Sequence, residues 1–255
     1  MPSNYSHMEF AKAVLSQLDT SLIHSITPEI DEYLVGSFGP DILFFYPPVF
    51  LSKYAKVGCE IHDRPAYEPL ERLRPLVGRG VPFAKSYAAG FICHFALDNE
   101  CHKFVSSAAK KAGLSHLGLE TEFDRYLMEK NGVDPLHFKP LNTLDVNQTL
   151  FCTLKGLYPF TQRELASCYR HQKSMSNLLI SCGGGPLSPV VNAFGGIKGT
   201  VMAKSARPSC AEACAQFDEA FKKTVPTAAF LVDSYMLSVK TNAPLDSMFN
   251  GAFSG

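Results

Sequence analysis

The sequence predicts an all-α fold, a compact bundle of several helices that forms one domain over residues 1–255. Two observations support this class: apolar residues recur at helical spacing along most of the chain, and no alternating strand pattern of useful length appears. With 255 residues, 46% of them hydrophobic and 19% charged, the chain is expected to bury a substantial core.

In the first half of the chain, helix signals alternate with breaks rich in proline and glycine. Apolar residues at helical spacing predict a helix over residues 8–18, and Thr27 with Pro28 predicts the start of a short one. The stretch FGPDILFFYPP, residues 38–48, is predicted to be a loop because glycine and proline interrupt it. Further helices are predicted over residues 65–77, about 83–111 and 115–131.

The remainder, residues 128–255, is also predicted to be helical. Thr161 and Glu164 form a capping-box signature, and Pro226 is expected to separate the last two helices. The glycine- and proline-rich stretch over residues 181–199 is predicted to be a mobile loop that could cover a cleft. Four helices are expected here, over residues 146–157, 161–181, 208–223 and 226–240.

Composition restricts the compartment and the partners. The 24 basic and 24 acidic residues balance, so no stable nucleic-acid partner is expected. The chain shows neither a secretory signal pattern nor an apolar run long enough to span a bilayer, so no transmembrane segment is expected. Eight cysteines without an export signal are expected to be mostly buried thiols, which predicts a cytoplasmic location. The oligomeric state stays open.

Residues suited to metal binding gather between positions 94 and 120. His94, Asp98 and His102 are four residues apart, so on a helix they line one narrow stripe. His116 and Glu120 repeat this spacing on the next predicted helix, which a short link can fold back beside the first. Imidazole and carboxylate groups on facing helices suit zinc, and zinc binding is the favoured interpretation. The alternative is a set of core histidines and ordinary helix-surface ion pairs.

Three upstream residues, His7, Asp41 and His62, each have an ordinary explanation when taken singly. Taken together with the stripe, however, their order along the chain resembles that of the bacterial zinc-dependent phospholipase C family. The order is His7, GPD with Asp41, EIH with His62, HxxxDxxxH and HxxxE. That family is similar in fold to the P1-type zinc nucleases. The resemblance covers about residues 1–127, and SHMEFAK and FGPDILFFY resemble small leaderless members rather than the secreted lecithinases.

The resemblance implies a site for two to three zinc ions per chain in an all-helical domain. The first two ions would be held by two sets of side chains: His62, His94 and Asp98 for one, and His102, His116 and Glu120 for the other.

The resemblance also implies a third ion and a catalytic carboxylate. The third zinc would be held by His7, by Asp98 as a bridge, and by the N-terminal amine and its carbonyl; removal of Met1 would place that amine on Pro2. Asp41 would orient or deprotonate the attacking water.

The expected activity is that of a zinc-dependent phosphoric ester hydrolase, a phospholipase C-like phosphodiesterase. Zinc lowers the pKa of bound water to about 7, so metal-bound hydroxide is expected to attack phosphorus. The expected substrate is a small phosphorylated molecule or a phospholipid head group. Three alternatives stay open: nuclease or phosphomonoesterase activity of the same site, a non-catalytic protein with structural zinc in closed sites, and a zinc sensor or store.

Overall fold

The computed structural model describes residues 4–185 and 199–254, and these residues form helices and connecting segments without a strand. The predicted all-α class is therefore confirmed. The α-helices are α1 (Asn4–Leu15), α2 (Thr20–Ile26), α3 (Ile30–Gly36), α4 (Lys53–His62), α5 (Tyr67–Gly78), α6 (Ala84–Ala112), α7 (His116–Lys130), α8 (Thr149–Thr153), α9 (Gln162–Ser181) and α11 (Ala211–Thr241). The 3-10 helices include η2 (Gly39–Leu43), which carries the buried Asp41, and η7 (Ser247–Asn250), which carries the buried Phe249.

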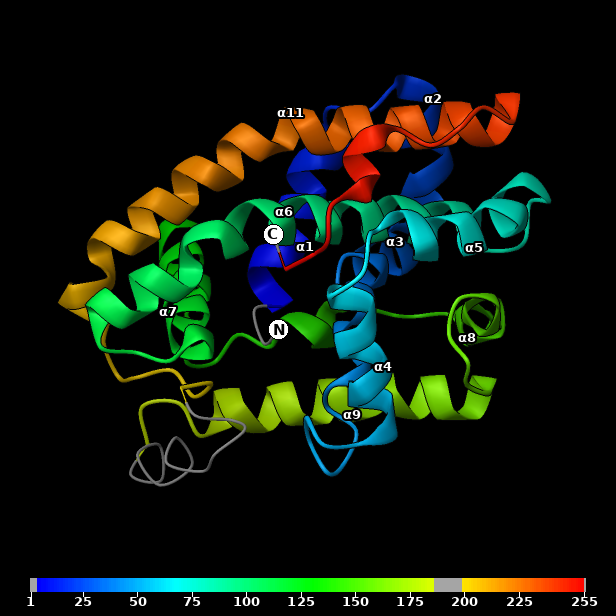
Figure 1. Ribbon diagram of the computed structural model, residues 1–255. Coiled ribbons are helices and arrows are strands. Elements are labelled where there is room, and N and C mark those ends of the chain that lie inside the picture. Colours follow the sequence, from blue (N-terminus) through cyan, green and yellow to red (C-terminus); the bar gives the residue numbers. More distant parts are fainter. Residues whose placement is uncertain (1–3, 186–198, 255) are drawn as a thin grey trace.

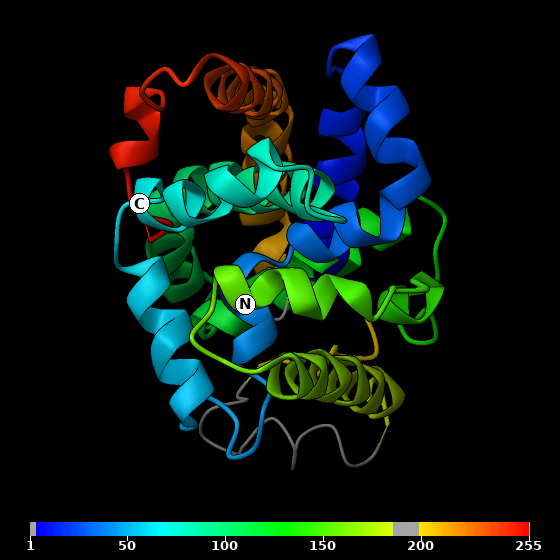
Figure 2. The ribbon, with the colours of Figure 1, turned by 90° about the vertical axis from the view of Figure 1, so that its right-hand side faces the viewer.

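The long helix α6 forms the centre of the bundle. It packs against α1, α3, α5, α7 and α11, while α11 and α9 lie along opposite sides of the molecule (Figures 1 and 2). The approach of α3 to α6 is close enough to require glycine, because a Cβ on Gly90 would lie 2.0 Å from the carbonyl oxygen of Tyr33. Most of α6 before residue 99 is buried, so its polar side chains must find partners inside the protein.

A single large apolar cluster contains residues from both halves of the chain. It includes Phe10 on α1, Tyr87 on α6, Leu150 on α8, Tyr235 on α11 and Phe249 on η7, all fully buried. That the whole chain forms one domain stays a prediction.

The prediction of a break at Pro226 was wrong. Helix α11 runs through it from Ala211 to Thr241. Proline removes one backbone donor and tends to kink a helix. Here the flanking Val225 and Ala228 are buried and α11 packs along α6, so tertiary packing outweighs the lost hydrogen bond.

Two helices were not predicted, although each has a capping residue. Ser52 begins α4, and its hydroxyl accepts a hydrogen bond from the amide of Ala55 at 3.2 Å. Asp19 begins α2 in the same way, through the amide of Ser21 at 2.8 Å. The predicted loop at 38–48 contains η2, and the predicted helix at 146–157 is divided into α8 and a 3-10 turn, Leu154–Gly156.

The C-terminal tail returns to the end of α4. The amide of Ser254 donates to the carbonyl of His62 at 3.3 Å. The amide of Ala66 donates to the carbonyl of Gly251 at 3.0 Å. These bonds place the last described residues against the side of the bundle that carries α4 and α6. The predicted mobile loop lies largely outside the described residues, because residues 186–198 are not among them.

The cysteines agree with the expectation of thiols. All eight are free, and five of them are buried. Among the described helices none combines the length and the apolar character that crossing a membrane requires.

Candidate metal centre

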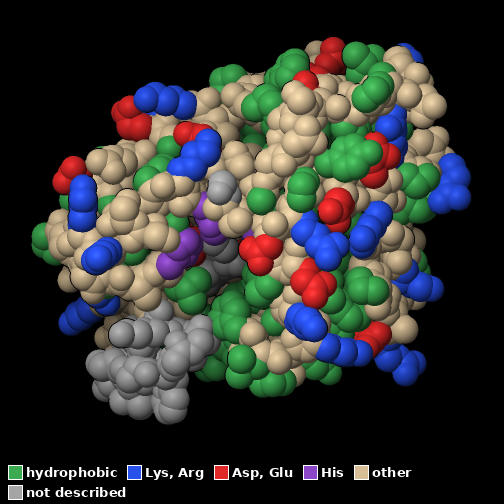
Figure 3. Space-filling view, in the orientation of Figure 1, with side chains coloured by type: hydrophobic (Ala, Val, Ile, Leu, Met, Phe, Trp, Pro, Cys, Tyr) green, Lys and Arg blue, Asp and Glu red, His purple; other side chains and the backbone are tan. Residues whose placement is uncertain are grey.

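Five elements bring the predicted site residues together. Helix α6 carries three of them and α7 two, while α1, η2 and α4 carry one each. Figure 3 shows histidine side chains in a hollow near the middle of one face of the molecule. The eight residues fall into groups whose nitrogen and oxygen atoms lie within 4.8 Å of one another: His7, Asp41 and His94; His62, His94 and Asp98; and His102, His116 and Glu120. Pro2 lies outside the described residues.

The carboxylate of Asp98 is the centre of this arrangement. Its Oδ1 lies 3.3 Å from Nε2 of His7. Its Oδ2 lies 3.4 Å from Nε2 of His94, 3.7 Å from that of His102 and 3.8 Å from that of His62. Asp98 is 1% exposed, and among the described residues neither oxygen receives a hydrogen bond of regular geometry. Four imidazoles therefore converge on one buried carboxylate.

Backbone carbonyls fix the orientation of two of these imidazoles. Nδ1 of His62 donates to the carbonyl of Gly58 at 2.8 Å, and Nδ1 of His94 donates to the carbonyl of Ser37 at 3.2 Å. With the proton on Nδ1, the lone pair of each Nε2 points into the site. The two Nε2 atoms are only 3.4 Å apart. Two lone pairs this close need a shared proton or a cation between them.

The electrostatics of the buried groups also favour a cation. Burial lowers the pKa of His94 to about 3, so this imidazole is neutral at physiological pH. Burial opposes ionisation of Asp98, but the facing imidazoles outweigh it and hold the pKa of Asp98 well below its ordinary value. Burial also raises the pKa of Asp41. The contact with His62, whose Nε2 lies 3.1 Å from Oδ1 of Asp41, helps to lower the net pKa of Asp41 below its usual value. Burial lowers the pKa of His7 and of His62, but the carboxylates of Asp98 and Asp41 outweigh it and the net pKa of each imidazole is raised. Protons on these two rings therefore supply the positive charge that a bound cation would replace.

Gly39 makes room for this side of the site. Its φ of 51° is in the left-handed region, and a Cβ there would lie 2.4 Å from Cδ2 of His94. Asp41 follows two residues later and is fully buried. The glycine thus allows η2 to place a carboxylate beside the imidazoles.

The third group is more exposed. Nε2 of His116 lies 2.8 Å from Oε1 of Glu120, and their side chains are 32% and 5% exposed. The ring of His102, whose side chain is 15% exposed, lies 5.0 Å from that of His116, centroid to centroid. Burial lowers the pKa of His116, but the carboxylate of Glu120 outweighs it and the net pKa is raised. This group lies at the solvent side of the hollow.

Asp124 connects α7, which carries His116 and Glu120, to α1, which carries His7. It lies four residues after Glu120 on α7, and its carboxylate accepts the amides of Tyr5 at 3.2 Å and Ser6 at 2.9 Å. Those amides belong to the first turn of α1, which has no intrahelical acceptor for them. Asp124 therefore fixes the start of α1, where His7 lies.

Other supporting residues were not predicted from the sequence. Phe253 is fully buried, and its ring centroid lies 5.5 Å from that of His62 and 5.7 Å from that of His94. The tail that contains it was predicted only as irregular, and no local pattern links residue 253 to the site. The carbonyls of Ser37 and Gly58 leave no signal in side-chain chemistry.

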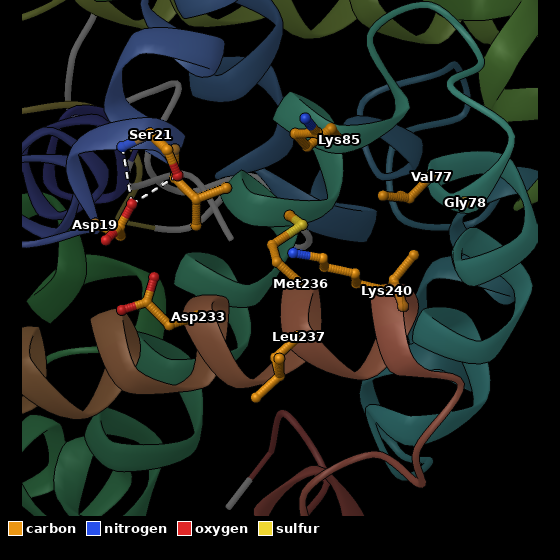
Figure 4. Close-up of a pocket in the computed structure, with 11 residues that line it drawn as sticks. Asp19, Ser21, Val77, Gly78, Lys85, Asp233, Met236, Leu237 and Lys240 are labelled. Atoms are coloured by element: carbon orange, nitrogen blue, oxygen red, sulfur yellow. Dashed lines mark hydrogen bonds between the residues drawn. The ribbon is translucent and has the colours of Figure 1, made fainter.

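A separate cavity of about 820 Å³ lies between α2, α5 and α11 (Figure 4). Its charged lining consists of two aspartates and two lysines, and it contains none of the eight candidate residues. The candidate metal ligands therefore lie outside this cavity.

The residues present fit zinc, since neutral imidazoles and carboxylates are the nitrogen and oxygen ligands that this ion takes. Searches of curated proteins and of solved structures find no match. A family model described as zinc dependent phospholipase C, in contrast, matches residues 6–174, a stretch that includes all eight candidates from His7 to Glu120. The chain therefore belongs to the zinc-dependent phospholipase C family.

Proposed function

We propose that this protein hydrolyses phosphoric esters, with phosphodiesters of phospholipid head groups as the substrate class, and that it uses two to three zinc ions. One observation supports this most directly: four imidazole nitrogens lie within 3.8 Å of the buried carboxylate of Asp98. A purely structural ion needs four ligands and a closed site. Seven candidate ligands beside an open hollow are more than one such ion needs.

The inner residues would hold one or two ions and the outer group another. The inner set is His7, His62, His94 and Asp98, with the carboxylate of Asp41 beside it, and the outer set is His102, His116 and Glu120. Zinc bound there supplies Lewis-acid chemistry: it acidifies water and neutralises charge on the phosphoryl oxygens. Carbonyl contacts on His62 and His94 keep those rings oriented for binding.

Asp41 is the candidate for handling the proton of the attacking water. Its carboxylate is fully buried and lies 3.1 Å from Nε2 of His62. An ionised carboxylate at this place accepts a hydrogen bond from water and orients the water toward phosphorus, or takes its proton. Phe253 and Phe44 form apolar walls beside His62 and limit the access of other water molecules.

Nuclease activity is the weaker alternative. Binding of single-stranded nucleic acid relies on exposed aromatic rings on which bases stack. Four rings near the motif were candidates for stacking. Phe44 and Phe45 are 7% and 2% exposed and pack in a small apolar cluster, and Tyr46 packs on Tyr54 with ring centroids 4.4 Å apart. Of these four, Tyr67 alone is strongly exposed, at 44%. The net charge of zero also gives no general attraction for a polyanion.

The test begins with zinc content by plasma mass spectrometry on protein whose N-terminus is confirmed by intact mass. The loaded protein is then offered a phosphodiester, a phosphomonoester, phosphatidylcholine and single-stranded DNA. We expect hydrolysis of diesters, with Asp41→Asn retaining zinc and losing about a hundredfold or more in rate, the scale of general acid–base catalysis.

Asp134→Asn is the matched control for this variant. Asp134 also contacts a histidine, His137, at 2.7 Å, but both side chains are more than half exposed and lie outside the site. Wild-type rates are expected for it. A zinc-loaded protein that hydrolyses none of the substrates, or an Asp41→Asn variant with the wild-type rate, would contradict the proposal.

A further inference from the structure

The segment between η2 and α4 presents apolar side chains to solvent beside the metal centre. Between Asp41 and Lys53 the chain contains no charged residue. Pro47 and Pro48 are exposed, and Leu51 is 83% exposed. Residues 47–51 form an apolar tip. A continuous apolar segment in water is unfavourable unless something covers it.

The apolar tip is held in a defined shape. The amide of Phe50 donates to the carbonyl of Phe44 at 3.0 Å, and the amide of Leu51 donates to that of Pro48 at 3.0 Å. The ring of Phe50 packs on those of Phe44 and Phe45, with centroids 5.7 and 5.9 Å apart. Phe50 has a φ of 60°, which is unfavourable for a residue with a side chain. Phe50 keeps this strained backbone conformation, and the next residue, Leu51, lies in solvent.

The apolar tip and the metal centre lie on the same face. The ring of Phe44, just before the tip, lies 5.3 Å from that of His62, centroid to centroid. Asp41 is three residues further upstream. Figure 3 shows hydrophobic side chains extending from the histidine-containing hollow toward the lower edge, where Figure 1 places the connection into α4.

Basic residues follow the tip directly. Lys53 is 65% exposed and pairs with Glu164 at 2.7 Å, while Lys56 is exposed one turn later on α4. Lysines beside an exposed apolar segment are typical of a surface that meets phospholipid head groups.

We propose that the apolar tip inserts into the surface of a phospholipid bilayer and thereby presents the metal centre to the head groups. This rests on the proposed function, because it explains how a site in a hollow reaches an ester at a membrane surface. A second copy of the chain is a poorer occupant. A stable dimer buries about 800 Å² on each partner, whereas Leu51 is the only strongly exposed large apolar residue of the tip.

The absence of tryptophan from the sequence allows a direct test of insertion. In Leu51→Trp the new indole is the only one in the chain. We expect its emission to shift to shorter wavelength when vesicles of phosphatidylcholine and phosphatidylglycerol are added. Leu237→Trp is the matched control, because Leu237 is also a leucine, is 59% exposed and lies on α11 (Figure 4). Figure 1 shows α11 on the side of the bundle opposite the connection into α4. Its emission should not change.

Loss of the side chain should weaken binding. For Leu51→Ser we expect vesicle affinity, measured by co-sedimentation, to fall about tenfold or more, as expected when one leucine no longer inserts. Leu237→Ser should bind like wild type. The proposal is overturned if the protein does not bind vesicles, or if it binds with Leu51→Ser unaffected. It is also overturned if wild type is a dimer that Leu51→Ser converts to monomer in light scattering.

Hydrolysis separates this proposal from the enzymatic one. The ratio of the rate on vesicles to the rate on a dissolved short-chain phosphodiester should fall about tenfold in Leu51→Ser, in proportion to the lost affinity. Hydrolysis of the dissolved ester without Leu51-dependent vesicle binding overturns the docking alone. Leu51-dependent binding without hydrolysis of any ester overturns the enzymatic function alone.

Discussion

The two parts of the candidate metal centre differ in how the fold holds them. The inner residues His7, Asp41, His62, His94 and Asp98 are between 0% and 8% exposed. Backbone carbonyls orient two of the imidazoles, and a glycine without room for a Cβ lies against one of them. In the outer group, by contrast, His116 is 32% exposed, and its Nδ1 lies 3.4 Å from the exposed hydroxyl of Ser106.

This difference suggests two tasks for one site. Side chains that are buried and oriented before a metal arrives lose little freedom on binding it, which favours high affinity. Side chains at the solvent side are held less tightly and exchange their ligands more readily. We expect the inner part to retain zinc against a chelator and the outer part to release it first.

Replacing Asp98 should have the largest effect, because it removes the feature on which the inner part depends. Asp98→Asn keeps the shape but removes the charge that faces four imidazoles. We expect the loss of about one zinc ion per chain or more, and a fall in hydrolysis of about a thousandfold. Zinc content and kcat/KM measure the two effects.

The matched control is again Asp134→Asn, whose histidine contact is exposed. Retention of full zinc content by Asp98→Asn would show that the buried carboxylate binds no metal. The inner residues would then be a polar network inside the bundle.

A smaller effect is expected from the outer part. His116→Ala should lower zinc content by about one ion per chain and leave the inner ions in place. Loss of a group that only supports a ligand costs about 10- to 100-fold in metal affinity, so loss of a ligand should cost at least as much. Titration with a chelator should give two phases in wild type and one in the variant. Two phases in His116→Ala would mean that His102, His116 and Glu120 do not form a metal site.

How much of this could be predicted depends on the range of the interactions involved. The stripe of His94, Asp98 and His102 is a local pattern, since four-residue spacing places side chains on one helical face whatever surrounds the helix. The convergence of His7 and His62 on Asp98 depends on packing between distant helices. Only the likeness to a family indicated it in advance.

The errors have the same origin. Pro226 lies within a helix because packing of α11 on α6 outweighs its local preference. Phe253 reaches the site because the tail bonds to the end of α4, through the amide of Ser254 and the carbonyl of His62. Local sequence does not encode either contact. The missed helix α4, however, had a readable signal in its cap, Ser52.

The smallest expected effect concerns Asp124, which links the helix of the outer part to the start of α1. Burial raises its pKa to about 6 from an ordinary value of 3.8, against the amides of Tyr5 and Ser6, which lower it. The native state thus holds a proton between these pH values that the unfolded state has lost. The stabilisation is complete below pH 3.8 and disappears as the pH rises through 6.

Asp124→Asn removes this titration. The quantity to compare is the difference in unfolding free energy between wild type and the variant, both free of zinc. We expect this difference to decrease by roughly 3 kcal/mol between pH 3.8 and 7. Denaturant unfolding at a series of pH values measures it. Asp19→Asn is the control. Asp19 also accepts a first-turn amide, that of Ser21, but it is exposed, and hydrogen bonds from the hydroxyl and the amide of Ser21 lower its pKa. Its contribution is present above pH 3.8 and is lost as the pH falls, so the two differences should change in opposite directions. The same slope in both would mean that Asp124 is ionised and solvated in the native state, and that α1 and α7 are not joined through a buried carboxyl group.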